Sequence, residues 1–210
     1  MGEDLYFYEN IFRSKGYRYI AGVDEAGRGP LAGPVIAAAV ILPEKEKEMI
    51  EGIKDSKKLT EKRREILYEE ITKKALCWSV GIVDEKTIDR INILNATLLA
   101  MRIAISKLSI KPEVLLIDAL RIPEVDIPQE SIIKGDNLSV SIAAASIIAK
   151  VTRDRIMYKY HEKFPIYNFN SNKGYGTAQH IEAIRKYGLS PIHRLTFTKK
   201  FIGIEKDENY

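Results

Sequence analysis

Two adjacent carboxylates interrupt an apolar part of the chain. Residues 19–23 are mostly apolar and predict a buried strand, and Asp24 and Glu25 follow it at once. Acidic residues are depleted from strands and are rarely buried without a partner. Two in succession, with the glycine-flanked Arg28 close behind, therefore predict a site at the end of a strand that binds a cation and an anionic group.

The apolar segments alternate between the periods of strands and helices. Runs rich in β-branched residues predict strands at 19–23, 35–42, 76–83, 114–118 and 131–133. Helical spacing predicts helices at 60–75, 84–108, 138–160 and 178–187. Such interleaving is typical of an α/β domain with a mixed sheet flanked by helices. We expect residues 1–160 to form this domain and residues 161–210 to form a small helical extension packed on it.

The helical patterns also predict which side chains face the core. Thr60 is suited to cap the helix 60–75, and Arg63 and Arg64 are expected on its outer face. The helix 84–108 carries an apolar stripe that is expected to pack against the sheet. The members of this stripe are Ile91, Leu94, Leu98, Met101, Ile105 and Leu108.

Composition narrows the class of protein. The net charge of +4 is mildly basic, which permits a polyanionic partner without requiring one. Cys77 is the single cysteine, so an intramolecular disulfide and a multi-cysteine zinc site are excluded, and we expect it as a small buried side chain. The longest apolar runs are too short to cross a bilayer, and the acidic N-terminus lacks the layout of a signal peptide. We therefore expect a soluble cytoplasmic protein.

Two further acids stand where predicted strands end. Asp118 closes the apolar strand 114–118, and Asp136 lies just before the helix 138–160. If these ends coincide with that of Asp24 and Glu25, four carboxylates converge, and such groups repel one another unless a cation lies among them. Ligands that are all oxygen favour Mg²⁺ or Mn²⁺ over zinc, and a pair of such ions suits phosphoryl chemistry.

Some of these acidic and basic residues also have purely structural interpretations. Asp118 can begin a turn, and Asp136 can cap the following helix. Lys150 and Arg153 lie one turn apart and could contact a phosphate, although for the lysine an ion pair with Asp154 is the favoured interpretation.

The glycine-rich segment 27–34 resembles a dinucleotide fingerprint only superficially. A strand rather than a helix follows it, and the preceding acids would repel a pyrophosphate. Gly27 and Gly29 could instead let the main chain approach a sugar hydroxyl while Arg28 holds a phosphate. A tight turn with a solvated Arg28 is the alternative, and both interpretations remain open.

A tyrosine stands between two glycines in the segment 173–177. Flanking glycines expose Tyr175, and an exposed ring can stack on a sugar or a base. Alternatively the segment is a helix-entry turn with Thr177 as the N-cap and Tyr175 packed locally. His193, in a later turn, is expected to be structural.

Taken together, the motifs closely resemble those of ribonuclease HII, the type 2 ribonuclease H. The resemblance covers about residues 20–197, in family order. It is carried by the segments 24–35, 55–59, 117–119, 135–136, 143–154, 173–177 and 190–194. One departure is Ala119, where many members have glycine, and it bears on the turn rather than on a ligand.

The resemblance implies a ribonuclease H-like fold and an endonuclease that requires Mn²⁺ or Mg²⁺, with two ions during catalysis. It implies that the enzyme cuts the RNA strand of RNA–DNA hybrids and cuts 5′ of single ribonucleotides embedded in duplex DNA, leaving 3′-hydroxyl and 5′-phosphate ends. We expect the enzyme to act as a monomer and not to bind a membrane. The implied metal ligands and catalytic acids are Asp24, Glu25, Asp118 and Asp136. The implied substrate-binding residues are Gly27, Arg28, Gly29 and Tyr175.

Two other hypotheses fit the acidic pattern. Another nuclease on the same fold, such as a resolvase, would cut all-DNA junctions. A non-catalytic module that binds hybrids would give no metal-dependent products.

Overall fold

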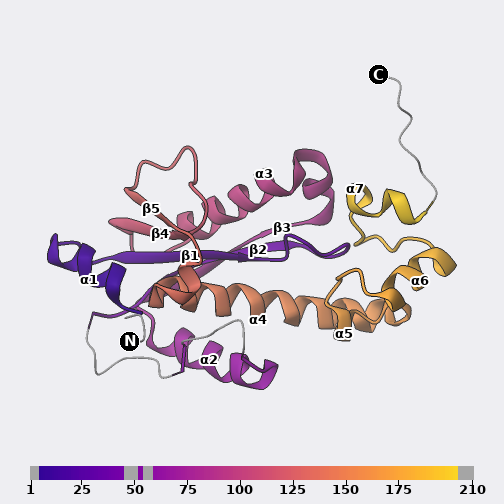
Figure 1. Ribbon diagram of the computed structural model, residues 1–210, viewed down its shortest axis with the longest axis horizontal. Coiled ribbons are helices and arrows are strands. Elements are labelled where there is room, and N and C mark those ends of the chain that lie inside the picture. Colours follow the sequence, from indigo (N-terminus) through magenta and orange to yellow (C-terminus); the bar gives the residue numbers. More distant parts are fainter. Residues whose placement is uncertain (1–4, 45–51, 54–58, 203–210) are drawn as a thin grey trace.

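The computed structural model describes residues 5–44, 52–53 and 59–202 (Figure 1). Its sheet has five strands, in the spatial order β3-β2-β1-β4-β5. The strands are β1 (Ile20–Ala26), β2 (Val35–Ile41), β3 (Cys77–Val83), β4 (Val114–Asp118) and β5 (Gln129–Ile132). β2 pairs antiparallel with β1 and β3, whereas β4 pairs parallel with β1 and β5. The predicted mixed α/β sheet is therefore confirmed.

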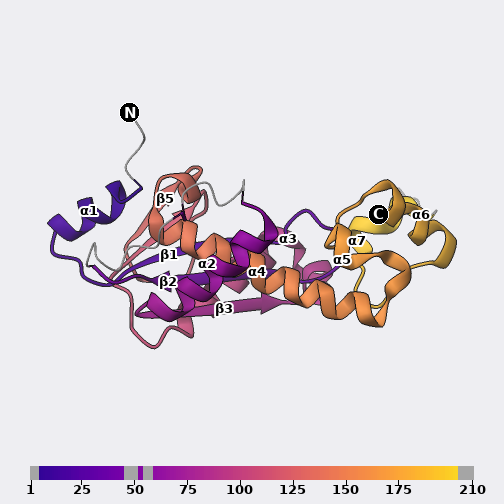
Figure 2. The same ribbon diagram turned by 90° about the horizontal axis from the view of Figure 1, so that it is seen from below.

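Helices cover both faces of this sheet and extend beyond one end of it. The α-helices are α1 (Phe7–Ser14), α2 (Glu61–Lys74), α3 (Glu85–Ser106), α4 (Val140–Lys163), α5 (Phe169–Asn172), α6 (Ala178–Tyr187) and α7 (Leu195–Thr198). The 3-10 turns are η3 (Gly135–Asn137), η4 (Pro165–Tyr167) and η5 (Lys199–Phe201). α3 packs on one face, and α4, with α2 outside it, packs on the other (Figure 1). Figure 2 shows α4 running from the sheet to the group formed by α5, α6 and α7.

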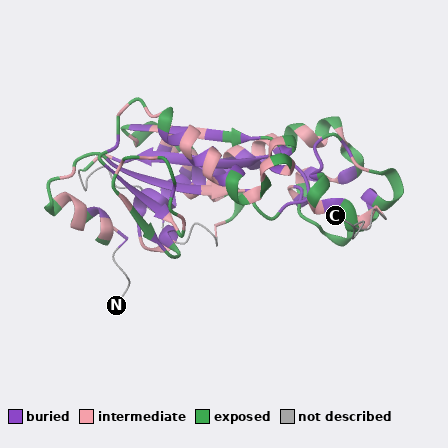
Figure 3. Ribbon diagram, turned by 90° about the horizontal axis from the view of Figure 1, so that it is seen from above, coloured by how far each residue is buried: buried purple, intermediate pink, exposed green. Residues whose placement is uncertain are grey.

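Small residues bring the helices unusually close to the strands. Buried positions run along the strands and along α4 (Figure 3). A Cβ on Gly22 in β1 would lie only 2.0 Å from the backbone carbon of Ser141 in α4. On the opposite face, a Cβ on Gly81 would lie 1.9 Å from the carbonyl oxygen of Ala100 in α3. The absence of a side chain at these two positions sets the spacing of the three layers.

β1 is longer than the pattern predicted, which changes the setting of the first two acids. Asp24 pairs with Ala38, and Glu25 pairs with Ala37, in the antiparallel ladder with β2. The ladder with β2 continues to Ala26, so the prediction that the acids follow the strand was wrong. They lie inside β1, where the ladder holds their backbone.

A kink interrupts α3 within its predicted stripe, and the stripe is only partly buried. Asn92 has φ of 65° and ψ of 167° within α3, and its side chain accepts a hydrogen bond from the backbone of Asn95. The kink shifts the helical phase between its two sides. Met101 and Ile105 are buried as predicted, but Leu94 is 46% exposed.

The helix caps confirm one prediction and contradict another. Thr60 accepts a hydrogen bond from the backbone N–H of Arg63, as predicted. Ser139 caps α4 by accepting from the N–H of Ile142, so the capping interpretation of Asp136 was wrong. Cys77 is buried, as expected.

The sequence patterns did not predict α1. Its Glu9 is fully buried, and one carboxylate oxygen accepts hydrogen bonds from the Ser139 hydroxyl at 2.6 Å and from the Ser141 N–H at 3.0 Å. α1 therefore fixes the start of α4. Across the described ranges, none of the helices combines the length and the apolar character that crossing a bilayer requires.

The close approach of β1 and α4 can be tested at Gly22. Gly22→Ala is expected to lower the free energy of unfolding by about 3 kcal/mol or more, because the added methyl group meets the backbone of α4 rather than a movable side chain. Urea unfolding would measure this. Gly29→Ala is the matched control, since the nearest described atom would lie 3.8 Å from its Cβ. Equal stability of the two variants would contradict the close packing.

Candidate active site

The parallel pairing of β1 and β4 brings Asp24 and Asp118 together. Val23 pairs with Ile117, so the next residues, Asp24 and Asp118, stand at the same level of two neighbouring strands. Both Val23 and Ile117 face α3. Because strand side chains alternate, Asp24 and Asp118 share the α4 face of the sheet. The residue after Asp118, Ala119, has a left-handed backbone, with φ of 53°.

Burial and mutual repulsion raise the pKa values of the first two acids. Asp24 is only 5% exposed, and burial, followed by the negative charges of Glu25 and Asp118, raises its pKa well above the ordinary value. The backbone N–H of Glu25 and the hydroxyl of Ser146 donate hydrogen bonds to Asp24 and partly offset this. Burial also raises the pKa of Glu25, while Arg28 acts in the opposite direction.

Asp136 reaches the same region through a backbone hydrogen bond. The N–H of Gly135 donates to Asp118 Oδ1 at 2.7 Å, which joins η3 to the end of β4. Asp136 is fully buried, and its Oδ1 accepts from the side chain of Asn137 at 3.1 Å. All four predicted acids therefore lie at one region of the sheet.

The acids do not form a ready metal cage. In the described part of the chain, no group of three or more His, Cys, Asp or Glu side chains is arranged to hold a metal ion. Glu25 is turned toward Arg28, with 3.3 Å between Oε1 and Nη1. The donor set nevertheless suits a hard divalent cation, since all its ligands are carboxylates and their charges repel. Glu25 Oε2 is buried and accepts no hydrogen bond from the described residues.

Arg194 holds the glycine-rich loop 27–34 from inside the molecule. Its guanidinium is fully buried and donates to the carbonyl oxygens of Gly27 at 2.6 Å, Arg28 at 3.0 Å and Gly33 at 2.7 Å. Burial, reinforced by the charge of Arg153, lowers its pKa to about 9. Since C=O and N–H point in opposite directions across a trans peptide, the N–H groups that follow Gly27 and Arg28 point away from Arg194.

Arg153 ties the same loop to the tyrosine segment. It is 1% exposed and donates to the carbonyls of Pro34 at 3.1 Å, Ala32 at 3.0 Å and Lys173 at 2.8 Å. The hypothesis that Arg153 contacts a phosphate was therefore wrong, because its donors are already engaged inside the protein.

The neighbouring Lys150 forms the structural pair that we considered. Its ammonium lies 2.6 Å from the carboxylate of Asp154. Burial lowers the pKa of Lys150, and Asp154 opposes that shift.

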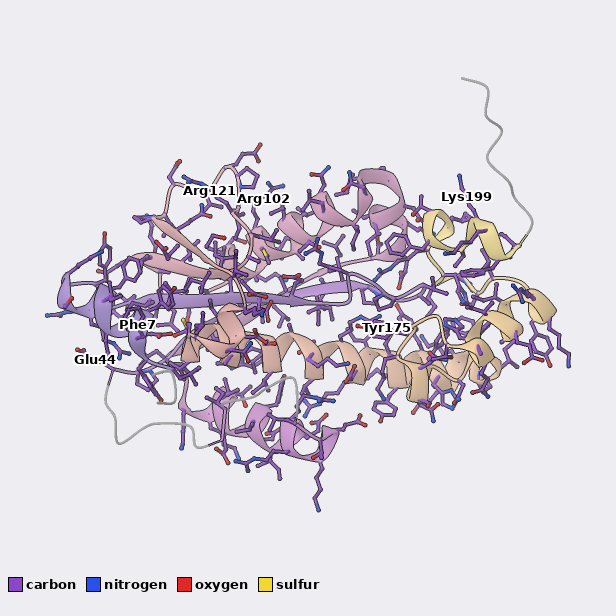
Figure 4. The ribbon with its side chains drawn as sticks, in the orientation of Figure 1. Phe7, Glu44, Arg102, Arg121, Tyr175 and Lys199 are labelled. Carbon is purple, nitrogen blue, oxygen red and sulfur yellow. The ribbon has the colours of Figure 1, made fainter. Side chains whose placement is uncertain are left out.

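Tyr175 projects beside α4, where the sheet meets the C-terminal group of helices (Figure 4). It is 46% exposed, and its ring approaches a Cβ position on Gly29 to 3.8 Å. The N–H of Leu31 donates to the Gly174 carbonyl at 2.8 Å and links the two segments. Thr177 does cap α6, as one interpretation predicted, yet the ring stays accessible.

Glu25, the start of the loop 27–34 and Tyr175 border one pocket of about 370 Å³. Its lining comprises Glu25, Ala26, Gly27, Arg28, Gly29, Arg64, Ser146, Ile147, Lys150 and Tyr175. Arg64 was expected on the outer face of α2, and that prediction was wrong. It lies three and seven residues before the buried Leu67 and Ile71, so helical periodicity does place it on the inner face. Of the segments that resemble ribonuclease HII, 55–58 lies outside the described residues.

Comparisons with known proteins agree with this geometry. The ribonuclease HII family model matches residues 21–200. The chain is 59% identical to ribonuclease HII of Acetivibrio thermocellus over 199 residues, which is 95% of this chain and 77% of that protein. The structure of ribonuclease H2 from Pyrococcus horikoshii OT3 superposes with a TM-score of 0.73 and 32% identity, covering 87% of this chain and 96% of that one.

A more distant structure shares the fold. Bst-RNase HIII, solved in complex with Mn²⁺, superposes with a TM-score of 0.70 at 22% identity, covering 90% of this chain and 71% of that one. The fold is thus ribonuclease H-like, and the extensive match to the family model and to curated relatives settles the membership. This chain belongs to the ribonuclease HII family, whose members are endonucleases that hydrolyse the RNA of RNA–DNA hybrids.

Proposed function

We propose that this enzyme cuts on the 5′ side of single ribonucleotides embedded in duplex DNA, as well as within RNA–DNA hybrids, and leaves 3′-hydroxyl and 5′-phosphate ends. The observation that carries the proposal is the pocket in which Glu25, the loop 27–34 and Tyr175 meet. An acid that can serve hydrolysis and an exposed ring that can sense a sugar lie on the same cavity. One chain supplies every group, which fits a monomer.

Asp24, Glu25, Asp118 and Asp136 are the proposed ligands of Mg²⁺ or Mn²⁺, with two ions bound during catalysis. Bound ions of this kind activate a water molecule and stabilise the leaving oxygen of a phosphodiester. Burial, and then the charges of Glu25 and Asp118, raises the pKa of Asp24, and this supports the assignment because a nearby cation would stabilise the charged carboxylate. The Mn²⁺ complex of Bst-RNase HIII, a protein with the same fold, is a second support.

Glu25 and Arg28 are proposed to exchange partners when substrate binds. Their ion pair is weak in geometry, at 3.3 Å, and Arg28 is 45% exposed at its side chain. Release frees the carboxylate of Glu25 to face the other acids, and it frees the guanidinium of Arg28 for a phosphate, which it can hold with two hydrogen bonds. Binding of substrate and assembly of the acidic set are thereby linked.

Recognition is assigned to the loop and to Tyr175. The backbone N–H groups of Arg28 and Gly29 point away from Arg194 and suit an oxygen acceptor of the sugar or phosphate. Tyr175 can stack on the sugar at the RNA–DNA junction, and the 2′-hydroxyl is the group that distinguishes RNA from DNA. The attacking group is then water, and the 2′-hydroxyl serves recognition alone.

Arg64 and Lys150 are proposed to contact a backbone phosphate at the pocket. They come from α2 and α4, and both line the cavity beside Arg28. Three cations around one opening attract a polyanion, and sequence-independent contacts of this kind dominate nucleic-acid affinity.

Asp24→Asn tests the metal-site assignment. We expect cleavage of a duplex with one ribonucleotide to fall on the order of a thousandfold or more in Mg²⁺ or Mn²⁺. Because the folded protein favours the protonated form of Asp24, the neutral amide should also leave the variant at least as stable as the parent at pH 7. That stability advantage should shrink as the pH falls toward the ordinary pKa of Asp. Unchanged turnover would refute the assignment.

Tyr175→Ala tests recognition of the sugar. The variant should lose roughly tenfold or more in kcat/KM on a duplex carrying one ribonucleotide, because a stacking contact is worth about 1–3 kcal/mol. Its melting temperature should change little, since the ring is half exposed. All-DNA duplexes and junctions, which the enzyme is expected to leave uncut, serve as the substrate control. A loss of stability that matches the loss of activity would indicate a packing role instead.

Salt dependence tests the phosphate contacts. In the Asp24→Asn background, Arg64→Ala should reduce the slope of log affinity against log salt concentration by about 0.9 for each lost phosphate contact. Lys62→Ala is the matched control, since Lys62 is an exposed cation on the same helix and does not line the pocket. Identical slopes for the two variants would show that Arg64 does not touch the nucleic acid.

A further inference from the structure

Two buried histidines form a hydrogen-bonded chain behind Tyr175. His180 is fully buried and His193 is 5% exposed. Their Nε2 atoms lie 3.0 Å apart, and His180 Nδ1 lies 2.8 Å from the carbonyl oxygen of Tyr175. At the other end, the backbone N–H of Ser190 donates to His193 Nδ1 at 2.9 Å, and the Ser190 hydroxyl lies 2.8 Å from the same nitrogen, to which it can also donate. The chain thus runs from Ser190 through both rings to the backbone of Tyr175.

The end groups of this chain determine where each proton lies. The Tyr175 carbonyl can only accept, so His180 carries its proton on Nδ1 and its Nε2 is an acceptor. His193 must therefore donate from Nε2, which leaves its Nδ1 as the acceptor that the Ser190 N–H requires. Every bond is satisfied when both rings are neutral. One additional proton on either ring would put two N–H groups against each other or against the Ser190 N–H.

We propose that this neutral His180–His193 pair is a positioning device that holds the backbone of Tyr175 and so sets where its ring meets the substrate sugar. The inference rests on the proposed recognition of single ribonucleotides. The Tyr175 carbonyl also accepts from the Thr177 N–H at 2.9 Å, so the side-chain bond from His180 adds to a local turn. The ring of Tyr175 stands opposite Gly29. A shift of the Tyr175 backbone therefore changes the distance between this ring and Gly29, where the sugar is proposed to bind.

The surroundings keep the pair uncharged. The ring of Tyr167 packs against His193 with centroids 4.8 Å apart, and its hydroxyl donates to the Gly188 carbonyl. Phe169 packs edge-on to His180 at 5.4 Å. Arg194, the charged neighbour in sequence, turns its guanidinium to the loop 27–34. Burial, and then the proximity of His180, lowers the pKa of His193 to about 4, and burial lowers that of His180.

The pH dependence follows from this direction of shift. An unfolded or opened histidine takes up a proton near pH 6.5, whereas the closed pair resists it. The closed arrangement is therefore fully favoured above about pH 6.5, and it loses stability as the pH falls from there toward 4. We expect the backbone around Tyr175 to become less ordered across the same pH range.

Paired substitutions at His180 separate positioning from packing. His180→Asn keeps an N–H near the position of Nδ1, while His180→Leu removes it, and both lose the bond to His193. We measure the ratio of kcat/KM on a duplex with one ribonucleotide to kcat/KM on a long RNA–DNA hybrid. The ratio should fall roughly fivefold to tenfold in His180→Leu, the size expected for one hydrogen bond. It should stay within about twofold of the parent in His180→Asn.

A matched core variant provides the control. Ile184→Ala lies on the same helix and in the same apolar cluster, and it should lower the melting temperature while leaving the ratio unchanged. An equal fall in Ile184→Ala, or equal ratios in His180→Leu and His180→Asn, would overturn the inference. A parent enzyme that does not cut the single-ribonucleotide duplex would refute the proposed function instead, so the two failures are distinguishable.

Nitrogen NMR of the parent enzyme tests the chain without any substitution. Long-range ¹H–¹⁵N spectra at pH 7 should show His180 protonated on Nδ1 only and His193 protonated on Nε2 only. Lowering the pH below about 6 should broaden or shift the Tyr175 amide before the strands unfold. A charged ring, or either histidine in the other tautomer at pH 7, would overturn the inference even if the variants failed to fold.

Discussion

The arrangement of this molecule depends on two buried guanidinium groups, those of Arg153 and Arg194. Both are almost completely withdrawn from water, and their guanidinium groups donate hydrogen bonds to backbone carbonyls. Burial of a charge is costly unless it is hydrogen-bonded, and here the dipoles of several carbonyls supply the bonds. The lowered pKa values of both arginines reflect that cost. In return, the loop 27–34, which is poor in large side chains, is held in one shape.

This network explains how segments far apart in the chain become one surface. Arg153 bonds to the loop 27–34 and to Lys173, two residues before Tyr175. Arg194, in the C-terminal part of the chain, donates hydrogen bonds to the loop 27–34. The residue before it, His193, forms an isolated antiparallel β-bridge with Ala32 of the same loop. A shift of the backbone in one of these segments would therefore strain the hydrogen bonds of Arg153 and Arg194, which join it to the others. The part that would recognise the sugar behaves as a single unit.

The limits of prediction from the sequence have the same physical origin. The convergence of Asp24 and Asp118 was predicted, because apolar strands can be recognised in a sequence and the ends of parallel strands lie side by side. Arg153 was considered for a phosphate contact because arginine is usually exposed, and only its carbonyl partners, distant in sequence, make its burial tolerable. The phase shift in α3 depends on one left-handed residue, Asn92, that a helical average cannot detect. Arg64 was misplaced although its spacing to Leu67 carried the correct signal.

The site therefore contains two charge sets that lie close together, each incomplete without a ligand of opposite sign. Burial, and then repulsion by Glu25 and Asp118, raises the pKa of Asp24, and a cation would relieve the repulsion. The buried arginines place positive charge behind a loop whose N–H groups point outward, and a phosphate would complete that arrangement. The ion pair of Glu25 with Arg28 joins the two sets while neither ligand is bound. A phosphodiester that arrives with divalent cations satisfies both at once, whereas either one alone leaves the other set unbalanced. This coupling gives a physical reason for the acids to lie beside the loop.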